Sequence, residues 1–597
     1  MTVLGVVLVA IAQVWVISAG WMNYWPQYTT HYNQLAEAFH RGQCCLLFKP
    51  DPAHLALVDP YDPVTNSLYR LRAGVHDTIL YNGKFYLSWG PVPALLLLPV
   101  KAMAGRSVIG DQYLVYAFTF GVMLFSALLL RSLWGRFFAD VPPWMLFLAI
   151  VTAGLSTPLP YTLARSAVYE AAILGGQCCL LAGLYAVCGG KHFPGRVRLA
   201  LAGSCWALAA GSRVSLAIAL AGLSVLVAWR IVRNGWRQSR RLDFGGLAAF
   251  GMPLAAGAVL LGAYNVARFG NWHEFGQRFQ LTNNNNYNSI PRLFQPANAV
   301  PGLYSYLLRT IQLHNQFPFV EAKPGDGRFP SFIRLPEYYE YNEPIAGLLI
   351  VTPFIWLALI PACRLAHAGV AGIRRRRVHH GDTENTEKTK SGRQLIGHSA
   401  PAGIAPIAPT DAASIGSLPS LSACSQNQLT ASSRHPERSE GTLCLAREET
   451  LRCAQDDGLK PSIRFQSSTG GGDQNAGPDQ NGHAGMDLNW CLLCLLTASL
   501  LGFAPIPFML GSTMRYLCDL TPCLMIVAGV GFWQRARDTA AGRAGRRRMF
   551  RAIAGTLAAW SIVIGMLLSV NGYYQHFFHF HRHLFGHISY WAHEFGE

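Results

Sequence analysis

The sequence is poor in charged residues. Asp, Glu, Lys and Arg make up 14% of its 597 residues, whereas an ordinary soluble domain contains about 25%. Hydrophobic residues make up 51%, and the mean hydropathy is positive at +0.21, even though residues 364–487 are strongly polar. This composition excludes an ordinary soluble globular protein and indicates an integral membrane protein.

Acidic residues are scarcer than basic ones. The chain has 32 Asp and Glu against 49 Lys and Arg, which gives a net charge of +17. The basic residues lie in short segments between apolar runs, and this distribution is typical of positive-inside topology. We therefore expect the charge to orient the chain in a lipid bilayer, and we expect no nucleic-acid partner.

Several chemical signatures are missing. The sequence has no P-loop, no dinucleotide-binding fingerprint and no HExxH motif. Its 14 Cys form no framework, because the CxxC of Cys491 and Cys494 stands alone on a hydrophobic run. The tail contains six His residues without suitably spaced acidic or Cys partners, so we predict an interfacial aromatic tail and no metal site. These His residues are His576, His579, His581, His583, His587 and His593.

Long apolar runs are the main feature of the sequence. Eleven of them have membrane length, and they predict an all-α polytopic membrane protein with about 11 transmembrane helices. The run 199–230 fits either two short helices with Arg213 at their turn or one tilted span. The eleven runs are 2–22, 113–131, 143–160, 167–187, 199–212, 214–230, 245–263, 345–362, 489–509, 517–534 and 550–571.

The basic clusters predict the sidedness of these spans. If the amino terminus is cytoplasmic, eleven spans place every cluster in the cytoplasm. A further crossing at 90–104 would put Arg131 and Arg136 outside, so we interpret 90–104 as a juxtamembrane or re-entrant helix. The other clusters are Lys191–Arg198, Arg230–Arg241, Arg374–Arg377 and Arg535–Arg548.

The topology predicts two large external loops, at 23–112 and 264–344. Residues 363–488 have a disordered composition, and we expect a polar cytoplasmic insertion there, with a regulatory tail as the alternative. The insertion would divide the membrane domain into a first segment, residues 1–362, and a second segment, residues 489–571. An external tail, residues 572–597, would follow.

The first loop supplies three candidate catalytic carboxylates: Asp77, Asp59 and Asp62. We rank Asp77 first because it lies closest in sequence to the next apolar run. Asp59 and Asp62 stand beside prolines in "VDPYDP", so turn formation is their structural alternative. The segment "YNGKFY" after Asp77 predicts a hairpin with Asn82-Gly83 at its turn.

Charged residues also lie at the ends of the predicted spans. "ARSAVYE" contains Arg165 and Glu170, and Arg213 and Arg515 have similar positions. Ionisable residues at membrane depth are functional candidates, and a planar guanidinium can bind two phosphate oxygens at once. The structural alternatives are a pair between Arg165 and Glu170 and a helical pair between Arg515 and Asp519.

The second loop opens with "YNVARFGNWHEFGQRFQLTN", which is rich in aromatic and amide side chains and contains Arg268 and Glu274. Such a segment can bind a sugar or a lipid head group. It can equally form an aromatic belt at the membrane interface.

With these segments in view, the chain resembles bacterial glycosyltransferases of the GT-C superfamily, of the mannosyltransferase and lipopolysaccharide-sugar-transferase type. The resemblance covers roughly 1–362 and 489–571. It rests on the architecture and on the segments "HYNQLAEAFHRG", "HDTILYNGKFYLSWGPVPALLLLP", "ARSAVYE", "AGSCWALAAGSRVSLAIAL", "YNVARFGNWHEFGQRFQL" and "MRYLCDLTP".

The resemblance implies a polyprenyl-phosphate sugar donor and an envelope glycan, lipid or protein as acceptor. It also implies an active site on the outer face of the bacterial inner membrane, and in some members a divalent cation. Many such enzymes carry an acid directly before the helix that starts near "HYNQLAEAFHRG". Here Tyr28 to His31 include no acid, so the base is expected at Asp77 or its neighbours.

Two other interpretations remain at this stage. A transporter or flippase of lipid-linked sugars should show repeated spans and broken helices in both halves, and we find no internal repeat. A catalytically inactive relative would account for the missing early acid.

Overall fold

The structure is a computed structural model of the chain. It describes residues 1–72, 74–105, 107–189, 195–283, 285–287, 293–322, 329–337, 339, 343–371, 479–540, 542, 544–573 and 575–594. Most of the expected insertion 363–488 therefore lies outside the described residues. The segments Met1–Arg375 and Pro478–Glu597 belong to one compact unit.

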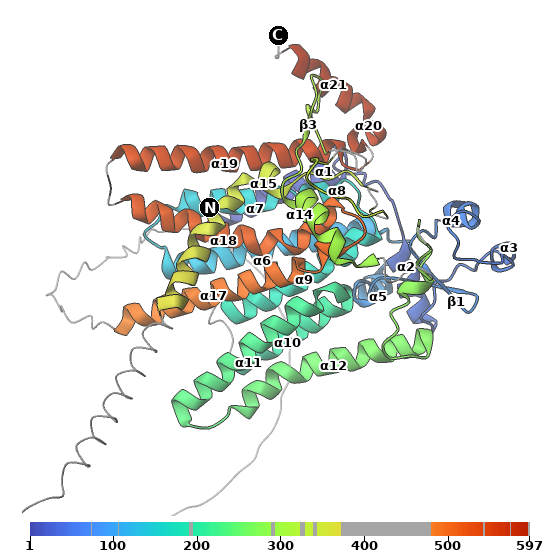
Figure 1. Ribbon diagram of the computed structural model, residues 1–597, viewed down its shortest axis with the longest axis horizontal. Helices are drawn as coiled ribbons and strands as arrows, with labels where there is room; N and C mark the ends of the chain where they lie inside the picture. Colours follow the sequence, from blue (N-terminus) through green and yellow to red (C-terminus); the bar gives the residue numbers. More distant parts are fainter. Residues whose placement is uncertain are drawn as a thin grey trace, which may run out of the picture. The chain divides into compact units, whose positions relative to one another are not determined.

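Helices are the main regular structure of the described portion of the chain (Figure 1). Its α-helices are α1 (Thr2–Ile17), α2 (His31–His40), α3 (Pro52–Leu55), α4 (Ser67–Arg72), α5 (Val92–Ala104), α6 (Asp111–Phe137), α7 (Pro143–Leu155), α8 (Leu159–Leu163), α9 (Val168–Cys188), α10 (Gly195–Ser212), α11 (Ala217–Ser239), α12 (Phe244–Phe269), α14 (Ala299–Leu307), α15 (Leu348–Val351), α17 (Asp479–Phe503), α18 (Thr521–Ala540), α19 (Ala544–Asn571), α20 (His576–Phe580) and α21 (Arg582–Glu594).

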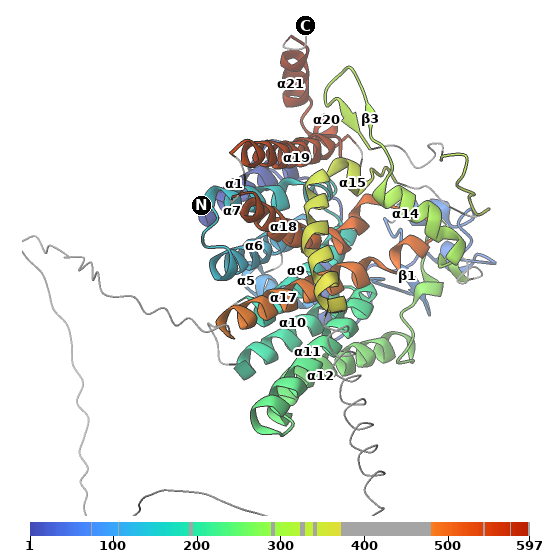
Figure 2. The same cartoon turned by 60° about the vertical axis from the view of Figure 1, so that its left-hand side comes forward.

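Short 3₁₀ turns and two hairpins complete the described structure. The 3₁₀ turns are η1 (Val214–Leu216), η2 (Gln277–Phe279), η3 (Pro296–Asn298), η4 (Pro353–Ala358), η5 (Ile506–Phe508) and η6 (Met514–Asp519). The antiparallel hairpins pair β1 (Ile79–Tyr81) with β2 (Lys84–Tyr86) and β3 (Gln312–Leu313) with β4 (Val320–Glu321). Figure 2 shows β3 near α20, and β4 packs against α19.

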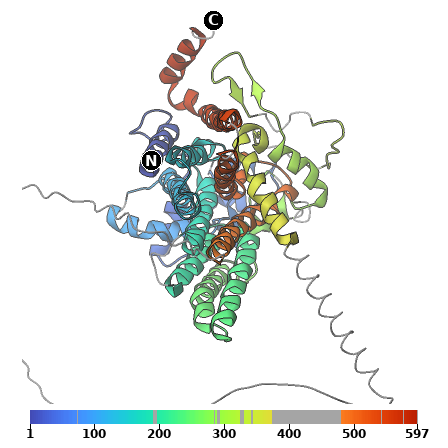
Figure 3. The ribbon, with the colours of Figure 1, turned by 90° about the vertical axis from the view of Figure 1, so that its left-hand side faces the viewer.

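Seven helices of the described chain are long and apolar enough to cross a membrane. The protein is therefore an all-helical membrane protein, as its composition predicts. These helices are Asp111–Phe137, Val168–Cys188, Val214–Ser239, Phe244–Phe269, Pro353–Ala371, Leu488–Phe508 and Ala544–Asn571. Helix α9 packs against α6 and α10, and α10 packs against α12. Figure 3 shows these helices in a view turned by 90° from that of Figure 1.

The run 199–230 forms two helices, which confirms the first of the two alternatives for this run. Helix α10 ends at Ser212 and α11 begins at Ala217, with Arg213 and η1 at the turn between them. The run 90–104 forms α5, a helix of 13 residues that packs against α2. Gly90 precedes α5 and packs closely against the backbone of Gly211. A Cβ at Gly90 would stand 1.9 Å from the Gly211 carbonyl oxygen, so this close approach requires glycine.

The segment "YNGKFY" forms the β1–β2 hairpin, as predicted. Asn82 and Gly83 have φ values of 47° and 68°, which suit the tight turns that favour Asn-Gly. The hairpin also joins the two long loops, because Leu281 donates its N–H to the Thr78 carbonyl at 2.9 Å. We call the end of the helices that carries this hairpin and the first turn of α9 the loop end.

Helix α2 starts on a carboxylate from a distant region of the chain. The side chain of Asp111 accepts hydrogen bonds from the N–H groups of His31 at 3.0 Å and Tyr32 at 3.2 Å, and from the Thr29 hydroxyl at 2.5 Å. The Thr29 hydroxyl oxygen in turn accepts from the N–H of Val168 at 2.9 Å. Asp111 therefore satisfies free N–H groups at the start of α2, and Thr29 ties this point to the start of α9.

Removal of this cap should destabilise the protein. Asp111 is fully buried, so Asp111→Ala leaves buried N–H groups without an acceptor and should lower the free energy of unfolding by about 2–3 kcal/mol. Thermal or denaturant unfolding of the detergent-solubilised protein measures the change. Asp111→Asn keeps an acceptor oxygen and should lose less, and equal stability of Asp111→Ala and wild type would contradict the capping role.

Candidate functional site

Residues from both long loops, from α9 and η6 and from the segments that precede these two helices enclose a cavity at the loop end. Its volume is about 290 Å³. The residues around it are His76, Asp77, Arg165, Tyr169, Thr282, Asn283, Glu343, Met509, Gly511, Ser512, Thr513, Arg515 and Tyr516. A neighbouring cavity of about 210 Å³ shares Asp77, Tyr169 and Arg515 with it and extends to Trp89.

The predicted base Asp77 lies in this cavity, between α4 and β1. Its N–H donates to the Leu281 carbonyl at 2.8 Å, and its carbonyl accepts from the Gln280 amide at 3.2 Å. Its φ is +61°, a left-handed conformation that is uncommon outside glycine. The two loops thus hold the backbone of Asp77 in a fixed position, while its side chain remains 19% exposed.

Tyr169 connects Asp77 to the arginines. Its hydroxyl donates to Asp77 Oδ2 at 2.8 Å. The Arg165 guanidinium lies 5.0 Å from its ring centroid and that of Arg515 lies 4.6 Å from it, within the range of cation–π attraction. Trp89 packs edge-on against the same ring at 4.7 Å. The ring therefore fixes both guanidinium groups relative to the carboxylate.

Glu343 binds both arginines. Its Oε1 lies 2.8 Å from Arg165 Nη1 and 2.6 Å from Arg515 Nη1, and Thr513 donates its hydroxyl to Oε2. Burial alone would raise the pKa of Glu343, but the charges of Arg515 and Arg165 and the hydrogen bonds outweigh burial and leave the pKa below its usual value. Glu343 therefore stays ionised. The glutamate charge outweighs the burial of Arg515 and raises the pKa of that guanidinium.

Three further charged residues lie near this cluster: Glu170, Arg213 and Asp519. Glu170 is fully buried, accepts from the N–H of Ala167 at 3.3 Å and lies 3.8 Å from Arg515. Arg213 forms an ion pair of 2.7 Å with Asp519, whose other oxygen accepts from the Gln177 amide at 2.9 Å. Neither of the pairs named as structural alternatives forms, because Arg165 and Arg515 both bind Glu343 and Asp519 binds Arg213.

His76 stands beside the carboxylate. Its Nε2 lies 3.6 Å from Asp77 Oδ2. Burial lowers the pKa of His76, and the positive charges of Arg70, Arg165 and Arg515 add to this effect, although Asp77 opposes it. These effects favour the neutral form of the His76 imidazole beside Asp77.

The other predicted carboxylates lie outside both cavities. Asp59 accepts from the N–H of Tyr61 at 2.9 Å and from the Asn285 amide at 2.7 Å, so it shapes a turn and links the two loops. Asp62 accepts from the N–H of Thr65 at 3.0 Å. Both therefore have the hydrogen bonds expected of turn formers.

The predicted residues of the second loop also have other contacts. Arg268 is buried and donates to the Leu87 carbonyl at 2.9 Å and to the Asn265 amide oxygen at 2.7 Å. Glu274 pairs with the exposed Arg278 at 2.9 Å. Neither residue is among those that enclose the two cavities.

The structure adds Glu343 and Tyr169 to the residues that the sequence suggests. Glu343 stands directly before an apolar run, and two arginines at this end of the spans require an anionic partner, which is the signal that could have identified it. Tyr169 lies inside the motif "ARSAVYE", and its role depends on the distant Asp77. A hydrogen bond between residues so far apart in the chain cannot be predicted from the local sequence.

A resident divalent cation does not fit this cavity. Asp77 accepts from Tyr169, and Glu343 is engaged by two arginines and Thr513. Within the described residues, no three His, Cys, Asp or Glu side chains gather as a metal site would require. In the tail, the ring nitrogens of His576 face Tyr28 and the Val16 carbonyl, each at 3.0 Å.

Comparisons of the chain with family models, with curated proteins and with solved structures give no match.

The ion cluster predicts a specific dependence of stability on pH. Because the pKa of folded Glu343 lies below its usual value of 4.5, its contribution is fully present above about pH 4.5 and is lost as the pH falls through the folded value. Glu343→Gln should lack this contribution, so its free energy of unfolding should depend less on pH below about pH 4.5. It should also lower the unfolding free energy at pH 7 by about 3 kcal/mol.

Denaturant unfolding between pH 3 and pH 7 measures both effects. Glu274→Gln is the matched control, since its partner Arg278 is half exposed, and it should cost less than about 1 kcal/mol. Equal losses in the two variants would show that Glu343 contributes no more than a surface ion pair.

Proposed function

We propose that the protein is a GT-C-type glycosyltransferase that transfers a sugar from a polyprenyl-phosphate donor to a cell-envelope glycan, lipid or protein. One observation carries the proposal: the Asp77 carboxylate and the Arg165 and Arg515 guanidinium groups enclose one cavity at the ends of membrane helices. The proposal includes eleven spans and a bacterial inner-membrane location. The cavity would face the periplasm or exterior.

The position of the cavity suits a lipid-linked donor. Tyr169 stands in the first turn of the apolar helix α9, so the cavity lies where a span meets the loops. The polyprenyl chain of the donor would remain in the bilayer while its phosphate and sugar enter the cavity. The acceptor hydroxyl would enter the same cavity from the side of the two long loops.

The chemistry follows from the charges. Asp77 would accept the proton of the acceptor hydroxyl as that oxygen attacks the anomeric carbon. The bond between the anomeric carbon and the phosphate oxygen breaks, and the lipid phosphate leaves with the electron pair. Arg165 and Arg515 would stabilise the growing charge on the phosphate with guanidinium N–H groups that are already in place.

Tyr169 and Glu343 would act as positioning residues. Tyr169 holds Asp77 Oδ2 and presents its ring to both arginines. Glu343 binds both guanidinium groups from one side, so their relative orientation is fixed before a donor arrives. N–H groups that are already oriented lose little free energy to reorganisation during the reaction.

Asp77→Asn should abolish most of the sugar transfer. A general base contributes about 10²- to 10⁴-fold to rate, so the variant should transfer at least about 100-fold more slowly while still binding the donor. The assay uses purified protein, a panel of radiolabelled polyprenyl-phosphate sugars and a bacterial envelope extract. Asp62→Asn, a change at a turn outside the cavity, should keep wild-type activity.

Transfer by Asp77→Asn at the wild-type rate would contradict the assignment of the base. Absence of transfer by the wild type with every donor, with donor binding retained, would favour a transporter or an inactive relative.

Tyr169→Phe tests the positioning of the base. The variant loses the hydrogen bond to Asp77 but keeps the ring beside both arginines. A hydrogen bond to a charged group contributes about 1.5–3 kcal/mol, so kcat should fall by about tenfold or more while the KM for the donor changes little. A change in KM alone would place Tyr169 in donor binding instead.

A further inference from the structure

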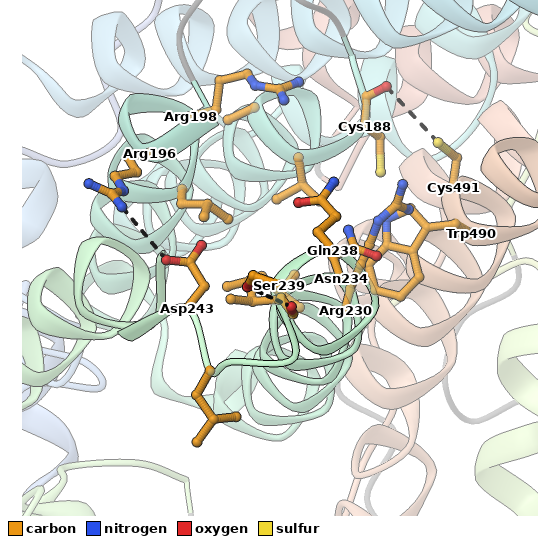
Figure 4. A pocket seen from close by; sticks show the side chains of 18 of the residues that line it. Cys188, Arg196, Arg198, Arg230, Asn234, Gln238, Ser239, Asp243, Trp490 and Cys491 are labelled. Carbon is orange, nitrogen blue, oxygen red and sulfur yellow. Dashed lines mark hydrogen bonds and ion pairs between the residues drawn. The ribbon is translucent and has the colours of Figure 1, made fainter. Parts of the chain in front are cut away.

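A third and larger cavity lies at the opposite end of the spans, away from the two at the loop end. Its volume is about 740 Å³, and it is enclosed by residues of α6, α9, α10 and α11 and by two residues from the middle of α17 (Figure 4). Helix α9 has 21 residues and is therefore about 30 Å long. Tyr169 stands in its first turn and Cys188 at its last residue, so this cavity and those at the loop end are separated by about the thickness of the hydrocarbon core.

The described residues around this cavity include five arginines and one carboxylate. The carboxylate, Asp243, is already engaged, because it accepts from the N–H of Gly246 at 2.9 Å at the start of α12 and lies 3.8 Å from Arg196. The cavity therefore has a strong excess of positive charge. The five arginines are Arg136, Arg196, Arg198, Arg230 and Arg241.

Packing holds several of these side chains around the space. The Arg230 guanidinium lies 4.7 Å from the ring centroid of the buried Trp490. Arg136 donates to the carbonyls of Ser132 and Cys188. Figure 4 shows Arg196 and Arg198 on one side of the space and Arg230 with Trp490 on the other. Positive-inside topology requires basic residues at this end of the spans, but it does not require them to surround a cavity.

Part of the cavity wall is apolar. Val227, Ile231 and Leu199 lie along its wall. The neighbouring helix α12 exposes apolar side chains toward its surroundings, among them Met252 at 69% and Leu260 at 70%. A soluble anion would use only the arginines, whereas a lipid would use the arginines for its head group and these apolar surfaces for its acyl chains.

We infer that this cavity binds a phosphate-bearing anion, namely the head group of an anionic phospholipid. Arginine suits phosphate because its planar fork donates two hydrogen bonds to two oxygens. Anionic lipids are abundant in the leaflet that basic loops face, and basic pockets between membrane helices bind their head groups. The volume also falls in the range of ligand pockets, about 300–1,000 Å³.

Native mass spectrometry of the purified full-length protein in neutral detergent tests this inference. The protein is titrated with phosphatidylglycerol, with phosphatidylcholine of the same acyl chains, and with phosphatidylglycerol in the presence of millimolar inorganic phosphate. The first phosphatidylglycerol should bind at least about tenfold more tightly than phosphatidylcholine, and the double variant Arg198→Gln/Arg230→Gln should lose about tenfold of that affinity, which corresponds to about 1.4 kcal/mol.

The matched control is Arg237→Gln/Arg240→Gln, which likewise removes two positive charges, but from exposed positions outside the cavity, and should leave the affinity unchanged. Should the double variant unfold, Arg198→Lys/Arg230→Lys takes its place and should keep a reduced preference for phosphatidylglycerol. Equal binding of the two lipids, or equal losses in the double variant and the control, would overturn the inference. Displacement of the lipid by inorganic phosphate would overturn the lipid assignment and leave a soluble phosphate as the ligand.

Discussion

The ion cluster around Glu343 is the interaction on which the arrangement of the loop end depends. It joins Arg165, just before α9, to Arg515, which follows α17, through a glutamate at the end of the second long loop. Arg515 belongs to the portion of the chain that follows residues 372–478, so the cluster binds the two membrane segments to each other. Removal of one member of a buried cluster leaves the other charges uncompensated, and this makes the arrangement costly to break.

The same cluster determines what the cavity can do. Glu343 offsets some of the positive charge of the two arginines, so a phosphate would be recognised by directed N–H groups more than by a large net charge. Tyr169 adds the second constraint, because one side chain contacts Asp77 and both guanidinium groups. A carboxylate and two cations held in this way form a site that is organised before a substrate enters.

The sequence predicts the helical membrane class, the α10–α11 turn at Arg213 and the β1–β2 hairpin, because apolar length, a single arginine and an Asn-Gly pair are local signals. Seven helices have the length and apolarity of spans. The number eleven remains a prediction, because the predicted runs that form α1, α7, α10 and α18 are not among these seven helices. The partners of Arg165, Arg515 and Asp519 could not be predicted, since each lies far away in the chain. An acid does lie at the start of α2, but it comes from Asp111, whose position near the "HYNQLAEAFHRG" helix depends on tertiary packing.

The most direct test of the account is the position of a bound donor phosphate. A cryo-electron microscopy map of the full-length protein with a non-transferable polyprenyl-phosphate sugar analogue would show it. The account predicts a phosphate within hydrogen-bonding distance of Arg165 and Arg515, with the anomeric carbon of the sugar facing Asp77. A phosphate bound away from these arginines, or a sugar that points away from Asp77, would contradict the proposed site.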